Sequence, residues 1–228
     1  MIAAAPETPL IMQANRAFLH RAVRFLVDEG VRQFLDIGSG IPTLGNVHEV
    51  AQKNAPEARV VYVDIDPVAV AHSRHILVGV QHTVVIQEDL RRPEHILGHP
   101  DVRKLIDFDE PVGLLLLAVV HFLPDSDDPI GLIGRLRDAL APGSHLVLSH
   151  ATSDGLSPEA AQRGAELSRR TPTPATPRTR AEVHRLFAGF DLVDPGLVWS
   201  RQWRPEHPDE VGDHPERSAV HVGVGRKR

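Results

Sequence analysis

Apolar residues follow two patterns along the first two thirds of the chain. Residues 13–30 carry apolar side chains at helical spacing, which predicts an N-terminal helix that ends at Gly30. Short apolar runs typical of buried strands stand at residues 33–38, 59–66, 82–88, 111–120 and 145–150. Helical segments are predicted between these runs, at residues 46–55, 67–78, 93–106 and 129–140. Strands that alternate with helices form a parallel sheet, and the run 111–120 is apolar enough for its centre.

Helices and a proline-rich loop are predicted after the fifth strand. One helix is expected to begin at Ser157, which suits a helix cap. Residues 171–179, TPTPATPRT, are rich in proline and threonine and are expected to form an internal loop. Thr179 and Glu182 can form a capping box, which predicts a further helix over residues 180–188.

Two strand-like runs close the chain, at residues 190–199 and 218–227, and the polar segment 200–217 joins them. They are expected to pair antiparallel at the end of an otherwise parallel sheet. The pattern as a whole predicts one α/β domain over residues 1–228. Its fold class is a Rossmann-like, doubly wound sheet that is mostly parallel, with the last strand antiparallel.

The run FLDIGSGIPT, residues 34–43, ends the first predicted strand with two glycines. Ligands of doubly wound sheets bind at the carboxyl ends of the strands, so this turn is the expected site. A dinucleotide fingerprint would need a third glycine and free backbone N–H groups for a pyrophosphate. Gly38 and Gly40 fit that pattern, but Thr43 stands at the third glycine position and Pro42 lacks an N–H. A nucleoside ligand without phosphate, such as S-adenosylmethionine, therefore suits the turn better.

Three carboxylates end three of the predicted strands. Asp36 can interact with a cationic amino group, and Asp64 can accept hydrogen bonds from both ribose hydroxyls, although NAD uses such an acid too. A helix cap is the alternative role for Asp64, and we assign that cap to Asp66 instead. Asp89 can accept from an adenine amino group beside the Leu90 N–H, or can belong to an ordinary turn.

The runs FLDIGSGIPT, VVYVDIDP, IQEDLRRP and LLLLAVVHFLPD resemble the successive motifs of class I S-adenosylmethionine-dependent methyltransferases. The chain is similar to a bacterial family of uncharacterised S-adenosylmethionine methyltransferases in NRAFLHRAVRFL, GIPTLGNVHEVAQ and WRPE, and the resemblance covers residues 13–227. It implies a seven-stranded sheet, S-adenosylmethionine as cofactor, and Ser39, Ile65 and Ala118 as further cofactor-binding residues. Family members usually carry an additional N-terminal segment, so a lid or part of the acceptor site is expected to be missing or truncated.

Two histidines close predicted strands and are candidates for a general base. His121 ends the central strand and His150 the next one, and histidine titrates near neutrality. Either side chain could take a proton from an acceptor hydroxyl or amine. The alternative for His121 is that it packs against the cofactor or caps the following loop.

Four other residues are secondary candidates. Asn15 and Arg16 open the first helix, a segment that often folds over the cofactor in methyltransferases. Trp199 and Trp203 could form an aromatic wall for an acceptor, or could pack the terminal strands.

Histidine pairs at helical spacing raise the question of a metal site. His95 with His99 and His72 with His75 could each share a helical face. Neither pair has an evident third ligand, so we predict no metal.

Composition limits the partners further. The net charge of −5, with acids and bases mixed, offers no basic stripe for nucleic acid. The absence of cysteine excludes the thiolate attack used on C5 of pyrimidines. No apolar run approaches the ~18 residues of a membrane span, which favours a cytoplasmic protein without a membrane partner.

The sequence therefore predicts methyl transfer to a small-molecule acceptor. No Asn/Asp-Pro-Pro-aromatic motif for nucleobase amines appears, so the acceptor is predicted by elimination. Two alternatives stay open: a protein that binds S-adenosylmethionine or S-adenosylhomocysteine without catalysis, and a nicotinamide oxidoreductase, which Pro42 and Thr43 disfavour.

Overall fold

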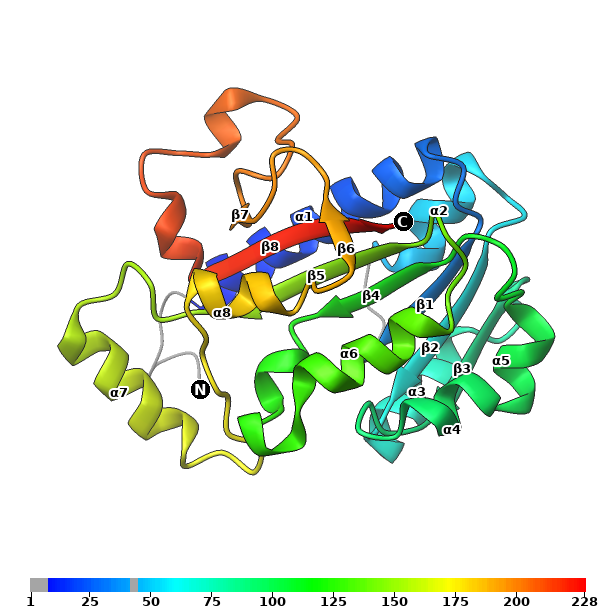
Figure 1. Ribbon diagram of the computed structural model, residues 1–228, viewed down its shortest axis with the longest axis horizontal. Coiled ribbons are helices and arrows are strands. Elements are labelled where there is room, and N and C mark those ends of the chain that lie inside the picture. Colours follow the sequence, from blue (N-terminus) through cyan, green and yellow to red (C-terminus); the bar gives the residue numbers. More distant parts are fainter. Residues whose placement is uncertain (1–7, 42–44) are drawn as a thin grey trace.

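The computed structural model describes residues 8–41 and 45–228 as a sheet with helices on both faces (Figure 1). Its strands are β1 (Gln33–Ile37), β2 (Arg59–Asp64), β3 (Thr83–Gln87), β4 (Gly113–Leu117), β5 (His145–Ala151), β6 (Phe190–Leu192), β7 (Val198–Trp199) and β8 (Val220–Lys227). They lie in the order β3-β2-β1-β4-β5-β8-β6, and β7 pairs separately with β8. The first five strands are parallel, whereas β8 runs antiparallel to β5. The predicted fold class, with its antiparallel last strand, is confirmed.

The strand count differs from the prediction at residues 190–199. That run forms two short strands, β6 and β7, which both pair antiparallel with β8. Pro195 lies between them and has no N–H to donate to a ladder, so one continuous strand cannot form there. The two-residue β7 is thus added to the seven strands that the resemblance implied.

The helices form two layers on the sheet. They are α1 (Thr8–Asp28), α2 (Val47–Asn54), α3 (Pro67–Ile76), α4 (Pro93–Gly98), α5 (Pro100–Leu105), α6 (Pro129–Asp138), α7 (Pro158–Ser168) and α8 (Arg180–Arg185). Buried side chains of α1, α2 and α3 pack on one face, and those of α4, α5, α6 and α8 on the other. Successive residues of β4, such as Leu114 and Leu115, face opposite layers, and the whole strand is buried as expected for the central strand.

Three helix predictions need correction. The first helix begins at Thr8 rather than at residue 13, so Asn15 and Arg16 lie inside it and do not open it. The helix expected over residues 93–106 is two helices, because His99 precedes Pro100 and is extended, with φ −62° and ψ 131°. The helix expected over residues 180–188 ends at Arg185, although its capping box from Thr179 is present. The predicted loop 171–179 contains no helix or strand.

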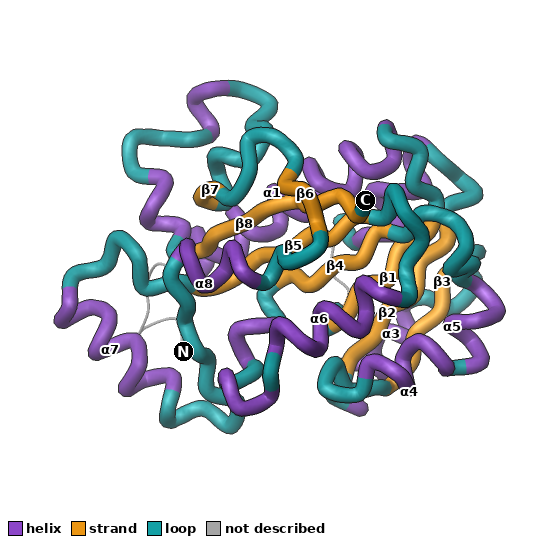
Figure 2. Tube along the Cα trace, in the orientation of Figure 1, coloured by secondary structure: helices purple, strands orange, loops and turns teal. Residues whose placement is uncertain are grey.

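A long excursion separates β7 from β8. Figure 2 shows it as mostly loop, with two short 3-10 helices, Pro208–Glu210 and Pro215–Ser218. Arg21 of α1 holds this excursion in place, because its side chain donates to the carbonyls of Trp203 (2.8 Å) and Ser200 (2.7 Å). The excursion is therefore docked on α1. No helix in the described part of the chain is long and apolar enough to cross a membrane.

Candidate cofactor and acceptor site

The turn after β1 packs tightly against the segment that follows β4. Gly38 has φ +78°, and a Cβ there would lie 2.3 Å from Cγ2 of Val119. Its N–H donates to the Val63 carbonyl at 2.8 Å, which joins the turn to β2. Gly40 has φ +64° but open space around it, and its N–H donates to Oδ2 of Asp64 at 2.7 Å. Only glycine fits at position 38, for both conformational and steric reasons.

The two acids at the end of β2 have separate structural roles. Asp66 caps α3, because its side chain accepts from the Val68 N–H at 2.8 Å. Asp64 does not cap the helix: Oδ2 accepts from Gly40 and Oδ1 from the Asp66 N–H at 2.9 Å. The predicted assignment of the cap is confirmed. Each oxygen of Asp64 has a second lone pair, so both can still accept a ribose hydroxyl.

Asp89, after β3, is held by Arg91. The Nε of Arg91 lies 3.0 and 2.9 Å from the two carboxylate oxygens, and its backbone N–H donates to Oδ1 at 2.9 Å. Burial acts to raise the pKa of Asp89, but these hydrogen bonds from Arg91 outweigh it and lower the pKa. The side chain is therefore an ionised acceptor at neutral pH.

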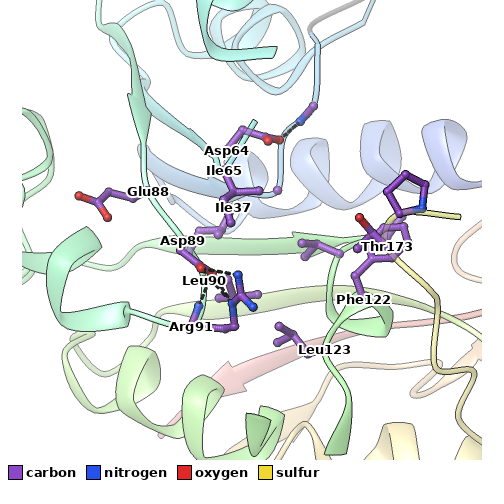
Figure 3. Close-up of a pocket in the computed structure, with 15 residues that line it drawn as sticks. Ile37, Asp64, Ile65, Glu88, Asp89, Leu90, Arg91, Phe122, Leu123 and Thr173 are labelled. Atoms are coloured by element: carbon purple, nitrogen blue, oxygen red, sulfur yellow. Dashed lines mark hydrogen bonds and ion pairs between the residues drawn. The ribbon is translucent and has the colours of Figure 1, made fainter. Parts of the chain in front are cut away.

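A cavity of about 580 Å³ lies at the carboxyl ends of β1 to β4 (Figure 3). Its wall contains seven of the nine predicted cofactor-binding residues: Gly38, Gly40, Asp64, Ile65, Asp89, Leu90 and Ala118. Ile37, Glu88, Arg91, Val119, Phe122, Leu123, Pro172 and Thr173 complete it. Residues from distant parts of the chain meet here because parallel strands bring their carboxyl ends to one edge.

The other two predicted residues, Asp36 and Ser39, line an adjoining cavity of about 190 Å³. Gly38 and Ala118 border both cavities. Asn15 from α1 also lines the smaller one, and in the described structure its Oδ1 and the Ser39 Oγ are buried without a hydrogen-bond partner. Buried polar atoms of this kind normally have partners, so the smaller cavity fits a polar ligand group.

Asp36 is the buried acid of this smaller cavity. Burial raises its pKa to about 7, opposed by the positive charge of Arg16 and reinforced by the negative charge of Asp64. Arg16, which lies inside α1 rather than at its start, lines the same cavity. A cation bound here would favour the ionised carboxylate and lower that pKa.

Ala118, where the cavities meet, has a strained backbone. Its φ is +54°, a region that residues other than glycine rarely adopt. Its N–H lies 2.8 Å from the Ser149 Oγ and 3.2 Å from the Ser149 carbonyl, so β5 holds the conformation. Strain of this kind concentrates at functional sites.

The two candidate bases are buried and do not line the larger cavity. His150 has both nitrogens engaged: Nδ1 donates to the Ala151 carbonyl at 2.7 Å, and Nε2 accepts from Arg178 at 3.0 Å. Burial, with the nearby charges of His150 and Arg178, lowers the pKa of His121 to about 3. Burial also lowers the pKa of His150 to about 4. The carbonyl of His121 accepts from the Thr176 N–H at 2.6 Å, in keeping with a role in holding a loop. Their catalytic role stays a prediction.

The tryptophans pack rather than line either cavity. Trp203 is fully buried, with its ring centroid 5.4 Å from that of Phe18 and 5.8 Å from that of Phe25. Trp199 stacks on His221 at 4.1 Å. Both side chains follow the packing alternative.

The histidine pairs do not form a common metal-binding face. His72 and His75 are exposed on α3, whereas His95 and His99 fall on either side of the break before α5. Over residues 8–41 and 45–228, no three His, Asp or Glu side chains are grouped to hold a metal ion.

Sequence reasoning missed the residues that the later loop contributes. Pro172 and Thr173 reach the cavity wall, and Arg178 bonds the loop to the end of β4. The only sequence signal for Arg178 is a lone arginine in a Pro/Thr-rich loop, which gives no hint that its side chain is buried.

Comparison with known proteins identifies the family. A family model described as S-adenosyl methyltransferase matches residues 1–228. The chain belongs to this family. It is thus an S-adenosylmethionine-dependent enzyme, and the expected cofactor and fold are confirmed.

Two solved structures of this methyltransferase fold are similar along the whole chain. A candidate methyltransferase from Thermobifida fusca YX is 41% identical, with a TM-score of 0.92, and the match covers 100% of this chain and 85% of that one. A DUF574 family protein from Streptomyces avermitilis MA-4680 is 39% identical, with a TM-score of 0.93, and the match covers 100% and 88%.

A more distant structure shares the fold alone. The N-methyltransferase NodS from Bradyrhizobium japonicum WM9 is 17% identical, with a TM-score of 0.52, and the match covers 92% of this chain and 97% of that one. No curated protein is similar enough to give a match.

Proposed function

We propose that this methyltransferase transfers the methyl group of S-adenosylmethionine to a small-molecule oxygen, nitrogen or carbon nucleophile, and that residues 1–228 form a single domain for that reaction. The observation that carries the proposal is the pair of cavities that meet at Gly38 and Ala118. One has carboxylates and apolar side chains suited to a nucleoside, and the other has buried polar groups suited to an amino acid.

The larger cavity would hold the adenosyl group. Asp64 accepts from the ribose hydroxyls, Asp89 accepts from the adenine amino group beside the Leu90 N–H, and Ile65 lies against the base. Ile65 is 53% exposed although apolar, which suits a side chain that a ligand covers. The two carboxylates supply acceptors, and the apolar side chains supply contact area for the rings.

The smaller cavity would hold the methionine part. Asp36 faces the ammonium group, Asn15 and Ser39 use their buried oxygens as hydrogen-bond partners, and Arg16 faces the carboxylate. Asp36 and Arg16 carry opposite charges, as do the ammonium and carboxylate groups of methionine, so each charge of the zwitterion would meet an opposite charge in this cavity.

Catalysis in this arrangement rests on positioning and exclusion of water. When bound, S-adenosylmethionine supplies a methyl carbon on a sulfonium, which the lone pair of a nucleophile attacks while the S–C bonding pair returns to sulfur. The chain holds the junction at Gly38 and Ala118 rigid, so that donor and nucleophile can align. Neither His121 nor His150 lines the larger cavity, so in this proposal the proton of an acceptor hydroxyl or amine is lost to water only when the product leaves the site.

A small acceptor is favoured over a macromolecule by charge and shape. The net charge of −5 repels a polyanion, and the cavity is a pocket in the sheet edge rather than a basic groove. Pro42 and Thr43, the residues that disfavour a nicotinamide cofactor, lie outside the described residues.

Calorimetric titration with S-adenosylmethionine and S-adenosylhomocysteine, with NAD as the control ligand, tests the proposal. We expect saturable binding of the first two. The variant Asp64→Ala should bind them about 10- to 100-fold more weakly, because hydrogen bonds to a charged acceptor contribute about 1.5–3 kcal/mol. The matched control Asp66→Ala removes a carboxylate two residues away and should cost only about 1 kcal/mol of stability through the lost cap.

Normal cofactor binding by Asp64→Ala would contradict the assignment of the ribose site. A labelled donor with a metabolite extract then tests transfer: a labelled product supports catalysis, whereas binding without any product favours the non-catalytic alternative. Tight binding of NAD would instead favour an oxidoreductase.

A further inference from the structure

One end of the larger cavity is left unused by the proposed nucleoside contacts. In Figure 3, Glu88 and Asp89 lie at one end, whereas Phe122 and Thr173 lie at the other. Phe122 is 42% exposed even though it is a large apolar side chain. An exposed aromatic ring on a cavity wall is typical of a ligand contact.

The side chains at this end of the cavity are apolar or uncharged. Phe122, Leu123 and Pro172 supply hydrocarbon surface, and the hydroxyl of Thr173 is the polar group beside them. We call these four residues the acceptor wall. The charged side chains among the described lining residues all belong to the β2 and β3 side of the cavity, where Arg91 is paired with Asp89. An ionised ligand on the acceptor wall would lose hydration without gaining a partner there.

The acceptor wall is held in place by a buried side chain. It combines the turn after β4 with the loop 171–179, and Arg178 joins the two with a buried guanidinium. Its Nη2 donates to the Leu123 carbonyl at 2.9 Å, and Nη2 and Nε contact Oδ1 of Asp125 at 2.6 and 3.2 Å. A wall held in this way loses little conformational entropy when a ligand binds.

We infer that the acceptor wall binds the methyl acceptor, and that this acceptor is an uncharged, planar, apolar molecule, such as a phenol or an aromatic amine. The inference rests on the proposed function, because it assigns the second ligand of the same cavity. The ring of Phe122 offers an aromatic face for offset or edge contact with a planar ligand. Thr173 can orient the hydroxyl or amine of the acceptor by a hydrogen bond at the rim.

The test uses 2-naphthol as the neutral planar probe and naphthalene-2-carboxylate as its charged analogue. Each is titrated calorimetrically into the ligand-free protein and into protein saturated with S-adenosylhomocysteine. We expect 2-naphthol to bind both forms, and the carboxylate to bind at least about tenfold more weakly because its charge has no partner. Phe122→Ala should weaken the binding of 2-naphthol about 3- to 10-fold, because one aromatic contact is lost.

Ile76→Ala is the matched control, since Ile76 is similarly exposed, at 47%, on α3 outside the cavity. It should leave naphthol binding unchanged. Equal or tighter binding of the carboxylate, no binding of naphthol, or an unchanged affinity in Phe122→Ala overturns the inference. Weakened binding of S-adenosylhomocysteine in Phe122→Ala also overturns it, because the ring would then belong to the nucleoside site. Failure of S-adenosylhomocysteine to bind the unmodified protein would count against the proposed function, while naphthol binding to the ligand-free form still decides the inference.

Discussion

Gly38 shows how one residue sets the geometry of the site. It permits a left-handed turn after β1 and leaves room for Val119 on the neighbouring segment. The turn and the end of β4 therefore pack directly on each other, and the two cavities meet at that contact. The strained Ala118 lies on the other side of the same junction.

Substitution of Gly38 should harm both folding and binding. In Gly38→Ala, the left-handed backbone alone costs about 1–2 kcal/mol, and a Cβ 2.3 Å from Val119 forces a further shift. Gly30→Ala is the matched control, because φ is +88° there but nothing lies within 4 Å of the added Cβ. Urea unfolding should show a clearly larger loss for position 38, and only that variant should lose affinity for S-adenosylhomocysteine. Equal losses in the two variants would show that the contact with Val119 is unimportant.

At the scale of elements, the loop 171–179 is an irregular segment that the fold holds firmly. Arg178 occupies a buried position beneath it and bonds to carbonyls and a side chain of the segment after β4 and to His150 of β5. The Thr176 N–H adds a bond to the His121 carbonyl. The loop is thus part of the cavity wall, although its sequence is typical of a flexible connection.

Loss of the Arg178 side chain should release this loop. Arg178→Met leaves buried acceptors such as Nε2 of His150 without their donor, at about 1–3 kcal/mol for each unsatisfied group. Hydrogen exchange should rise in peptides covering residues 171–179 and stay unchanged in β1 to β3. Arg163→Met, on the exposed surface of α7, serves as control. Unchanged protection at Thr176 would mean that packing rather than the guanidinium holds the loop.

At the scale of the whole molecule, the C-terminal excursion and the N-terminal helix form one assembly beside the cofactor site. Trp203 lies between Phe18 and Phe25 of α1, and Arg21 bonds to the excursion from the same helix. Asn15, in the N-terminal half of that helix, lines the smaller cavity. Residues nearly two hundred positions apart therefore cooperate in placing one wall of the site.

Trp203→Ala should weaken cofactor binding from outside the cavity. Truncating a fully buried tryptophan costs about 3–5 kcal/mol, and α1 loses its anchor. Arg21→Met is a milder variant that removes only the two hydrogen bonds. Both should raise the Kd for S-adenosylhomocysteine, whereas Trp199→Ala, which disturbs the stacking on His221 away from α1, should not. If Arg21→Met and Trp203→Ala bind S-adenosylhomocysteine normally at a temperature where both remain folded, the position of α1 at the site does not depend on its contacts with the excursion.

Local sequence patterns predict the α/β alternation, the central strand and the edge of the sheet that carries the site. These features depend on the local spacing of apolar residues and on the glycine and aspartate residues at strand ends. Both act through residues that are close in the sequence. The sequence also distinguishes the roles of Asp64 and Asp66, because the proline after Asp66 marks the start of the helix.

The remaining wall of the site depends on contacts between distant parts of the chain. The broken helix at His99 was readable from Pro100, but the burial of Arg178, the packing of Trp203 and the position of Phe122 depend on partners far along the chain. Such contacts form only when the helix layers pack on the sheet, so no local sequence pattern predicts them. The cofactor could therefore be predicted from residues at strand ends, whereas the acceptor wall appears only when the turn after β4 and the loop 171–179 meet.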